Sequence, residues 1–136
     1  LANLGSEHAL VIHSQDGLDE ISIAACTDVI EYSAGAFKEW RIDPHDFDCS
    51  HPNLDKIIVE TPAQSLAIAE AVFSGSLGPA RDIVLLNTAA ALYCADPNQN
   101  FGQAVKNAAT AIDSGLAGQR FHQLRTLTQT LASKEI

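Results

Sequence analysis

Short apolar runs occupy the first sixty residues and predict extended segments. Residues 9–12 form a continuous apolar run bounded by polar residues and then by glycine, which is typical of a short buried strand. Trp40 and Ile42 are two positions apart and share one face of another such run. Residues 33–35 contain glycine and predict a hairpin between the extended runs at residues 28–32 and 38–42. The four further runs predicted to be extended are residues 20–24, 28–32, 38–42 and 56–60.

A polar loop is predicted over residues 43–53, and helical periodicity dominates from residue 61 onward. Thr61, Pro62 and Gln64 combine an N-cap, a proline at the first helical position and a capping-box glutamine. They predict the start of a helix that ends at Gly75. Its expected apolar stripe is Leu66, Ala69, Val72 and Phe73.

Three further helices are predicted. The first begins at Pro79, is apolar nearly all round over residues 83–95, and ends at Pro97, so we expect it to be buried between other elements. The next has Asn100 as its N-cap, and Gly115 separates it from the last. Their expected apolar positions are Phe101, Ala104, Val105, Ala108 and Ile112 for the first of this pair, and Phe121, Leu124, Leu127 and Leu131 for the second.

The size and composition fit one globular unit, or part of one, of the α/β class. The chain has 136 residues, of which 46% are hydrophobic and 18% charged. It contains no methionine, so we expect that it is not an intact translation product. Residues 1–5 have the pattern of a helix tail closed by a C-cap glycine, which suggests a boundary inside a larger fold.

The charge and the cysteines count against several classes of protein. A formal charge of −9 with scattered basic residues disfavours nucleic acid as a partner. Cys26, Cys49 and Cys94 are odd in number and lack Cys-x-x-Cys spacing, so neither a disulfide framework nor a structural zinc site is indicated. The longest apolar stretch is too short to cross a bilayer and no secretory pattern opens the chain. We therefore expect a cytoplasmic protein with no membrane contact.

Asp19 and Glu20 are the main candidate for chemistry. They follow the first predicted strand and Gly17, and ligands of open α/β sheets gather beyond strand ends. Neighbouring side chains on a regular strand point to opposite faces, so the two acids can approach one ion only from a turn, which Gly17 permits. Mg²⁺ commonly uses one or two protein carboxylates and completes its shell with water and phosphate. The pair therefore predicts a magnesium site, with Asp16 either as a supporting acceptor or as a turn-forming residue.

Other polar residues are assigned structural roles. Residues 43–51 contain several His, Asp and Cys side chains, but their spacing fits no established zinc pattern. We expect His13 to be a hydrogen-bonded structural imidazole and Asn87 to bond neighbouring backbone. Arg81 and Asp82 are expected to form a local pair near a helix start. The spacing indicates no Ser-His-Asp or Cys-His arrangement, which disfavours a nucleophilic hydrolase.

Two separated motifs resemble a known family. The first comprises residues 11–13 and 16–22, and the second comprises residues 78–79, 81–87 and 89–93. In this order and at this distance they look like anthranilate phosphoribosyltransferase, and the similarity runs through most of the chain. The departures are Ser14 and Asp48 in place of usual glycines, and Glu60-Thr61-Pro62 in place of a customary glycine pair.

The resemblance implies a fold and an activity. The chain would be the C-terminal part of a mixed-sheet α/β catalytic domain of the nucleoside phosphorylase/phosphoribosyltransferase type, without the N-terminal helical domain. The full-length enzyme, which we expect to be a homodimer, would transfer a phosphoribosyl group from phosphoribosyl pyrophosphate to anthranilate in tryptophan biosynthesis. Asp19 and Glu20 would bind the Mg²⁺ that contacts the pyrophosphate, and no other family ligand maps onto these residues.

The resemblance also implies that the 136-residue chain alone behaves differently from the full-length enzyme, and it leaves two alternative functions open. No glycine-rich phosphate loop is present, so we expect the fragment alone to be inactive and its exposed apolar surface to favour self-association. One alternative is a related phosphorylase or phosphoribosyltransferase with another acceptor. The other is a non-catalytic nucleic-acid-binding relative, against which the acidic charge counts.

Overall fold

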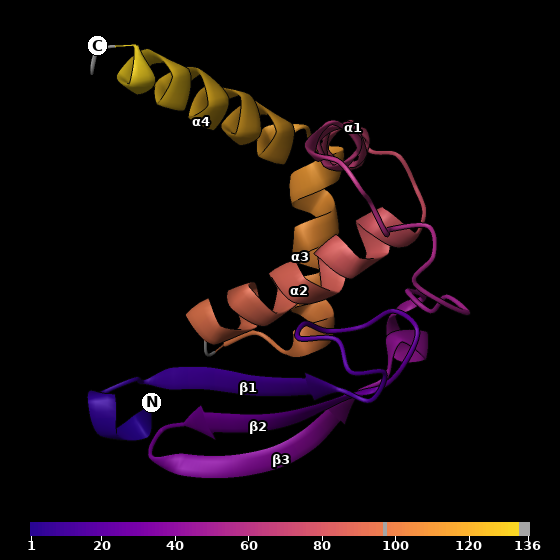
Figure 1. Ribbon diagram of the computed structural model, residues 1–136. Coiled ribbons are helices and arrows are strands. Elements are labelled where there is room, and N and C mark those ends of the chain that lie inside the picture. The colour runs from indigo at the N-terminus through magenta and orange to yellow at the C-terminus, as the bar shows by residue number, and fades with distance from the viewer. Residues whose placement is uncertain (97, 134–136) are drawn as a thin grey trace.

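A three-stranded sheet lies at one end of the molecule, and four helices extend from it (Figure 1). The structure, a computed structural model, describes residues 1–96 and 98–133. In Figure 1, α2 and α3 cross between the sheet and the far end of the molecule, where α1 and the projecting α4 lie. In chain order the elements are a short 3₁₀-helix (Ala2–Leu4), β1 (His8–Ser14), β2 (Thr27–Ser33), β3 (Ala36–Ile42), a second 3₁₀-helix (Pro44–Phe47), α1 (Pro62–Phe73), α2 (Pro79–Ala95), α3 (Phe101–Asp113) and α4 (Leu116–Ala132).

The sheet is antiparallel with strand order β1-β2-β3. Residues 9–12, 28–32 and 38–42 lie within its three strands, so these predictions are confirmed. The hairpin between β2 and β3 turns through Ala34 and Gly35, whose φ angles are 50° and 82°. Two successive positive φ angles suit the right-handed twist of a tight hairpin.

One face of the sheet is covered by helices and the other is open. Ile12, Val29 and Trp40 are direct neighbours across the three strands and pack into the core, together with Ile42, as the two-residue spacing predicts. On the opposite face, Val11 is 55% exposed. The core continues through side chains of α2 and α3, which pack against each other.

The helix starts follow the local signals in the sequence. The Thr61 Oγ1 accepts a hydrogen bond from the Gln64 N–H at 3.2 Å, and Gln64 Oε1 accepts one from the Thr61 N–H at 3.1 Å, which completes the capping box. Asn100 caps α3 through the Gln103 N–H at 2.8 Å. The four predicted helices are therefore confirmed, while the predicted stop at Pro97 lies outside the described residues. The five expected inward positions of α3 are all buried.

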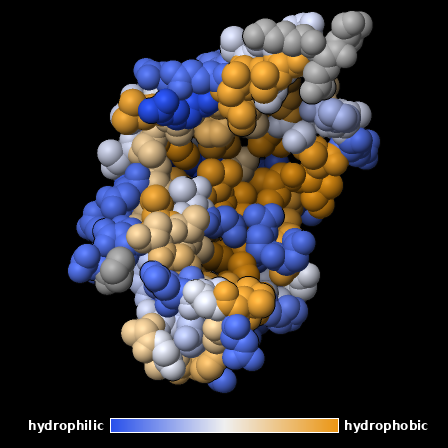
Figure 2. Space-filling model, turned by 90° about the vertical axis from the view of Figure 1, so that its left-hand side faces the viewer, coloured by the Kyte–Doolittle hydropathy of each residue, from blue (hydrophilic) through white to orange (hydrophobic). Residues whose placement is uncertain are grey.

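The apolar stripes of α1 and α4 are less covered than those of the other helices. Phe121 stacks on Phe73 with ring centroids 5.0 Å apart, which joins α4 to α1. Beyond that contact, Leu124, Leu127 and Leu131 are each more than half exposed. Figure 2 views the molecule from the left-hand side of Figure 1 and shows hydrophobic residues gathered around a hollow on that side. No helix in the described part of the chain combines the length and apolarity needed to span a membrane.

Two predicted extended segments are wrong. Residues 20–24 are a bent loop, in which Ile21 and Ile23 are fully buried but the Ser22 N–H donates to Thr27 Oγ1 instead of to a strand. Residues 56–60 are also irregular, and Ile58 there is 69% exposed. Both segments have the apolar content of a strand but no partner strand beside them in the described part of the chain, so composition alone misassigned them. The predicted loop over residues 43–53 contains a short 3₁₀-helix.

Asp48 occupies a left-handed conformation, with a φ of 56°. This explains why glycine suits this position, because only glycine adopts such angles without a steric penalty. We expect Asp48→Gly to raise the free energy of unfolding by about 0.5 kcal/mol, since relief of strain exceeds the added entropy of the unfolded chain. Urea unfolding of the two proteins measures the change. Asp46→Gly, which alters the preceding 3₁₀-helix instead, should not stabilise, and stabilisation by both changes would contradict the explanation.

Candidate metal-binding loop

The loop between β1 and β2 carries the two candidate carboxylates. The chain leaves β1 through a turn in which the Gly17 N–H donates to the Ser14 carbonyl at 2.9 Å, and Gly17 has a φ of 87°. Asp19 and Glu20 follow in irregular backbone, and both are exposed. The structure therefore provides the non-strand backbone that two adjacent acids need to face one ion.

Asp16 holds the first half of this loop. Its carboxylate accepts hydrogen bonds from Ser14 Oγ at 2.7 Å, from Ser22 Oγ at 2.6 Å and from the Leu18 N–H at 3.2 Å. Burial raises the pKa of Asp16, but the bonds from Ser22, Ser14 and Leu18 outweigh it and leave the pKa below its usual value. These contacts identify Asp16 as the turn-forming residue of the two roles considered for it.

Asn87 of α2 holds the second half. Its Oδ1 accepts from the Ile21 N–H at 2.9 Å, and its Nδ2 donates to the Ile21 carbonyl at 2.9 Å and to the Ile83 carbonyl at 2.9 Å. The expectation that Asn87 bonds backbone is confirmed. One of its two backbone partners is Ile21, the residue directly after Glu20, and the sequence did not reveal this partner.

The two carboxylates influence each other. Although Glu20 is exposed, neighbouring protein atoms partly desolvate its carboxylate and raise its pKa, and the negative charge of Asp19 raises it further. A divalent cation between them would relieve this repulsion, and the pair offers only oxygen donors, as Mg²⁺ prefers. Within residues 1–96 and 98–133, no group of three or more His, Cys, Asp and Glu side chains is arranged to hold a metal. Asp19 and Glu20 supply only two side-chain ligands, so an ion held between them would take its remaining ligands from water and phosphate.

The polar loop at residues 43–51 makes separate structural contacts. Asp43 caps the 3₁₀-helix through the His45 N–H at 2.9 Å, and His45 Nε2 lies 3.1 Å from Ser50 Oγ. Burial raises the pKa of Cys49 to about 11, which keeps this thiol protonated. The contacts support the structural interpretation of this loop over a zinc site.

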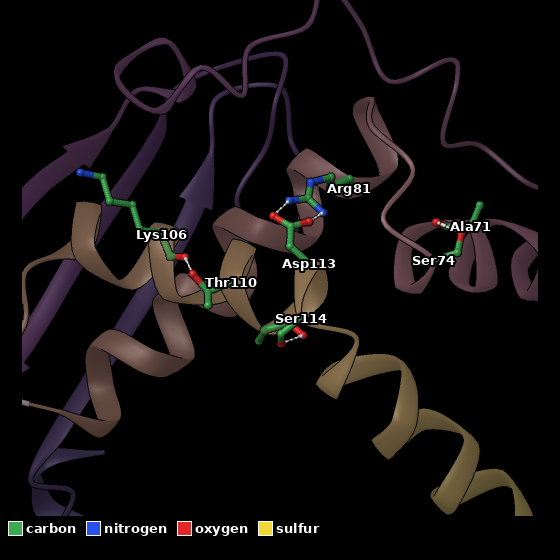
Figure 3. Close-up of polar contacts among 8 residues, drawn as sticks. Ala71, Ser74, Arg81, Lys106, Thr110, Asp113 and Ser114 are labelled. Atoms are coloured by element: carbon green, nitrogen blue, oxygen red, sulfur yellow. Dashed lines mark hydrogen bonds and ion pairs between the residues drawn. The ribbon is translucent and has the colours of Figure 1, made fainter.

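Arg81 and Asp82 do not pair with each other, so the predicted local pair is wrong. The Arg81 guanidinium binds both carboxylate oxygens of Asp113 at the end of α3, with Nη1–Oδ1 and Nη2–Oδ2 distances of 2.9 and 3.0 Å (Figure 3). Asp82 instead lies 2.7 Å from His51 Nε2. Adjacent helical residues do not face each other, which is why each side chain finds a distant partner.

His13 differs from its expected role, and Glu31 makes contacts that the sequence did not predict. His13 lies exposed near the end of β1, on the open face of the sheet, and not in the buried setting expected of a hydrogen-bonded structural imidazole. The buried Glu31, which the sequence did not single out, lies 2.9 Å from His8 Nε2 and accepts a hydrogen bond from the Tyr93 hydroxyl at 2.9 Å. Burial, reinforced by this bond and by the charge of Glu31, raises the pKa of Tyr93 to about 12. An acid in the middle of a predicted strand was the only sequence signal for this cluster.

The chain is similar in sequence to curated anthranilate phosphoribosyltransferases. It is 60% identical over 131 residues to the enzyme of Legionella pneumophila (strain Paris), a match that covers 96% of this chain and 38% of the relative. It is 46% identical over 128 residues to the enzyme of Thioalkalivibrio sulfidiphilus, a match that covers 94% of this chain and 38% of the relative. The chain therefore spans about 38% of the length of these relatives.

Solved structures with the same name share the fold. Anthranilate phosphoribosyltransferase from Saccharomyces cerevisiae in complex with PRPP and Mg matches with a TM-score of 0.71 and 28% identity, over 81% of this chain and 32% of that chain. The Thermus thermophilus enzyme matches with a TM-score of 0.74 and 24% identity, over 85% of this chain and 34% of that chain, which supports the fold alone. The family model described as "Glycosyl transferase family, a/b domain" matches residues 1–118. On this match, together with the α/β arrangement of its strands and helices, the chain belongs to this glycosyl transferase family.

Proposed function

We propose that this chain is the C-terminal portion of the α/β catalytic domain of an anthranilate phosphoribosyltransferase. The full-length enzyme transfers the phosphoribosyl group of phosphoribosyl pyrophosphate to the amine of anthranilate, a step of tryptophan biosynthesis. The observation that carries the proposal is the 60% identity to the Legionella pneumophila enzyme across 96% of the chain. In this proposal, the N-terminal helical domain and the residues that hold the donor phosphates lie outside these 136 residues.

In this enzyme Asp19 and Glu20 hold Mg²⁺ against the pyrophosphate of the donor. A related yeast structure contains PRPP and Mg together, which supports magnesium as the cofactor. When bound, the ion supplies positive charge where negative charge develops on the departing pyrophosphate. The two carboxylates orient the ion, and we assign them no general-base role.

An acceptor assay separates this function from that of a related phosphorylase or transferase. We expect the full-length protein, with magnesium and phosphoribosyl pyrophosphate, to form phosphoribosyl anthranilate and to leave nucleosides unchanged in the presence of phosphate. Nucleoside cleavage without anthranilate turnover would replace the proposal with the phosphorylase alternative. A mobility shift of the 136-residue chain with nucleic acid should be absent, because its net charge of −9 repels phosphate backbones.

The isolated 136-residue chain should be inactive. It contributes the carboxylate pair but lacks a glycine-rich loop to hold the donor phosphates. We expect no product above background from the purified chain in the same assay, and measurable transfer would contradict the proposal. We expect the exposed leucines of α4 to cause the isolated chain to self-associate in sedimentation. We expect the full-length enzyme to form a homodimer.

A further inference from the structure

We propose that Asn87, in the middle of α2, is a positioning residue for the Asp19–Glu20 pair; this inference rests on the function proposed above. The Asn87 amide meets the backbone of Ile21, the residue directly after Glu20. Its Oδ1 accepts from the Ile21 N–H and its Nδ2 donates to the Ile21 carbonyl, both at 2.9 Å. A side chain from a helix thus engages both polar groups of one loop residue.

This double contact fixes more than one distance. Two hydrogen bonds to the N–H and the C=O of one residue restrain both the position and the rotation of its backbone. The second proton of Asn87 Nδ2 bonds the Ile83 carbonyl at 2.9 Å, which holds the amide itself in one orientation. Because Ile21 is 0% exposed, loss of Asn87 would leave its polar backbone groups buried without these partners.

The pair is also held from its other side. Asp16 accepts a hydrogen bond from the Leu18 N–H, directly before the pair. Asp19 and Glu20 therefore lie between a backbone segment anchored by Asp16 and one anchored by Asn87. Such support strengthens ion binding, because carboxylates on an already ordered backbone lose less conformational freedom when the ion binds. This role also explains a polar residue within the apolar stretch of α2, since a half-buried amide is tolerated where it is hydrogen-bonded.

The test is Asn87→Ala in the full-length enzyme, with Asn87→Ser as a milder variant should the alanine protein fail to fold. We expect hydrogen exchange of the Ile21 amide, measured without metal, to accelerate about tenfold or more. The magnesium concentration for half-maximal turnover should rise about tenfold. The KM for anthranilate should stay unchanged, because the proposed function assigns this loop to the magnesium ion and the donor pyrophosphate and gives it no contact with the acceptor.

Val105→Ala is the matched control. Val105 is a buried residue of α3 that packs in the same core, so its truncation destabilises the protein without removing a bond to the loop. It should leave both the Ile21 exchange rate and the magnesium requirement unchanged. Equal effects of the two substitutions, or no effect of Asn87→Ala, would overturn the positioning role.

The outcome for Asp19 and Glu20 separates this inference from the function on which it rests. If neutralising the two acids changes the magnesium requirement and Asn87→Ala does not, the positioning role alone fails. If neutralising the acids has no effect, the proposed metal site fails and the positioning role fails with it.

Discussion

Asp19→Asn combined with Glu20→Gln in the full-length enzyme should lower turnover about a hundredfold or more at a fixed, physiological magnesium concentration. Both substitutions keep the size of the side chain and remove its charge. Because both side chains are exposed, the loop should retain its fold after the change. Steady-state turnover against magnesium and donor concentration measures the effect.

The matched control is Asp55→Asn with Glu60→Gln. These two acids are also exposed and their neutralisation removes the same net charge, but they lie in a different loop. Turnover should stay within about twofold of the unchanged enzyme, because exposed charges at a distance are largely screened. Near-normal kinetics of the Asp19 and Glu20 variant, or an equal loss in the control, would reject the assigned metal site.

Asp113→Ala should lower the free energy of unfolding by about 2–3 kcal/mol. Arg81 is only 6% exposed, and removal of Asp113 would leave its guanidinium buried without the carboxylate that it binds in two places. The expected loss is below that of a fully buried pair because Asp113 is 58% exposed and water can reach the vacated position. Urea unfolding of the chain provides the measurement.

A double variant tests the cause of this loss. Arg81→Met with Asp113→Ala removes the buried charge together with its partner, so we expect a loss of only about 1 kcal/mol. The double variant should therefore be more stable than Asp113→Ala alone. A double variant that is less stable than the single one would show that packing of the Arg81 stem, and not its unpaired charge, dominates.

The parts of the fold that depend on neighbouring residues were predictable. The capping box of Thr61 and Gln64 is complete within four residues, and its two hydrogen bonds form as the pattern indicates. The Ala34-Gly35 turn is equally local. Such signals need no knowledge of what packs nearby, which is why the starts of α1 and α3 and the hairpin were correctly placed.

The parts that depend on distant partners were not predictable from pattern. Ile21 and Ile23 alternate like a strand, yet the residue between them is bonded to Thr27 and Asp16. Arg81 selects a partner 32 residues away instead of its neighbour. In the candidate site, the two acids and Gly17 could be identified from the sequence, but the support from Asn87 is a tertiary contact that spacing does not encode.

The contact between Ile21 and Asn87 spans 66 positions of the chain. During synthesis the acidic loop therefore leaves the ribosome well before the helix that fixes it. A polypeptide that terminates upstream of α2 would display both acids on a loop that keeps the Asp16 contacts but lacks those of Asn87. The geometry of this loop is consequently completed late in biogenesis, when the C-terminal half has folded.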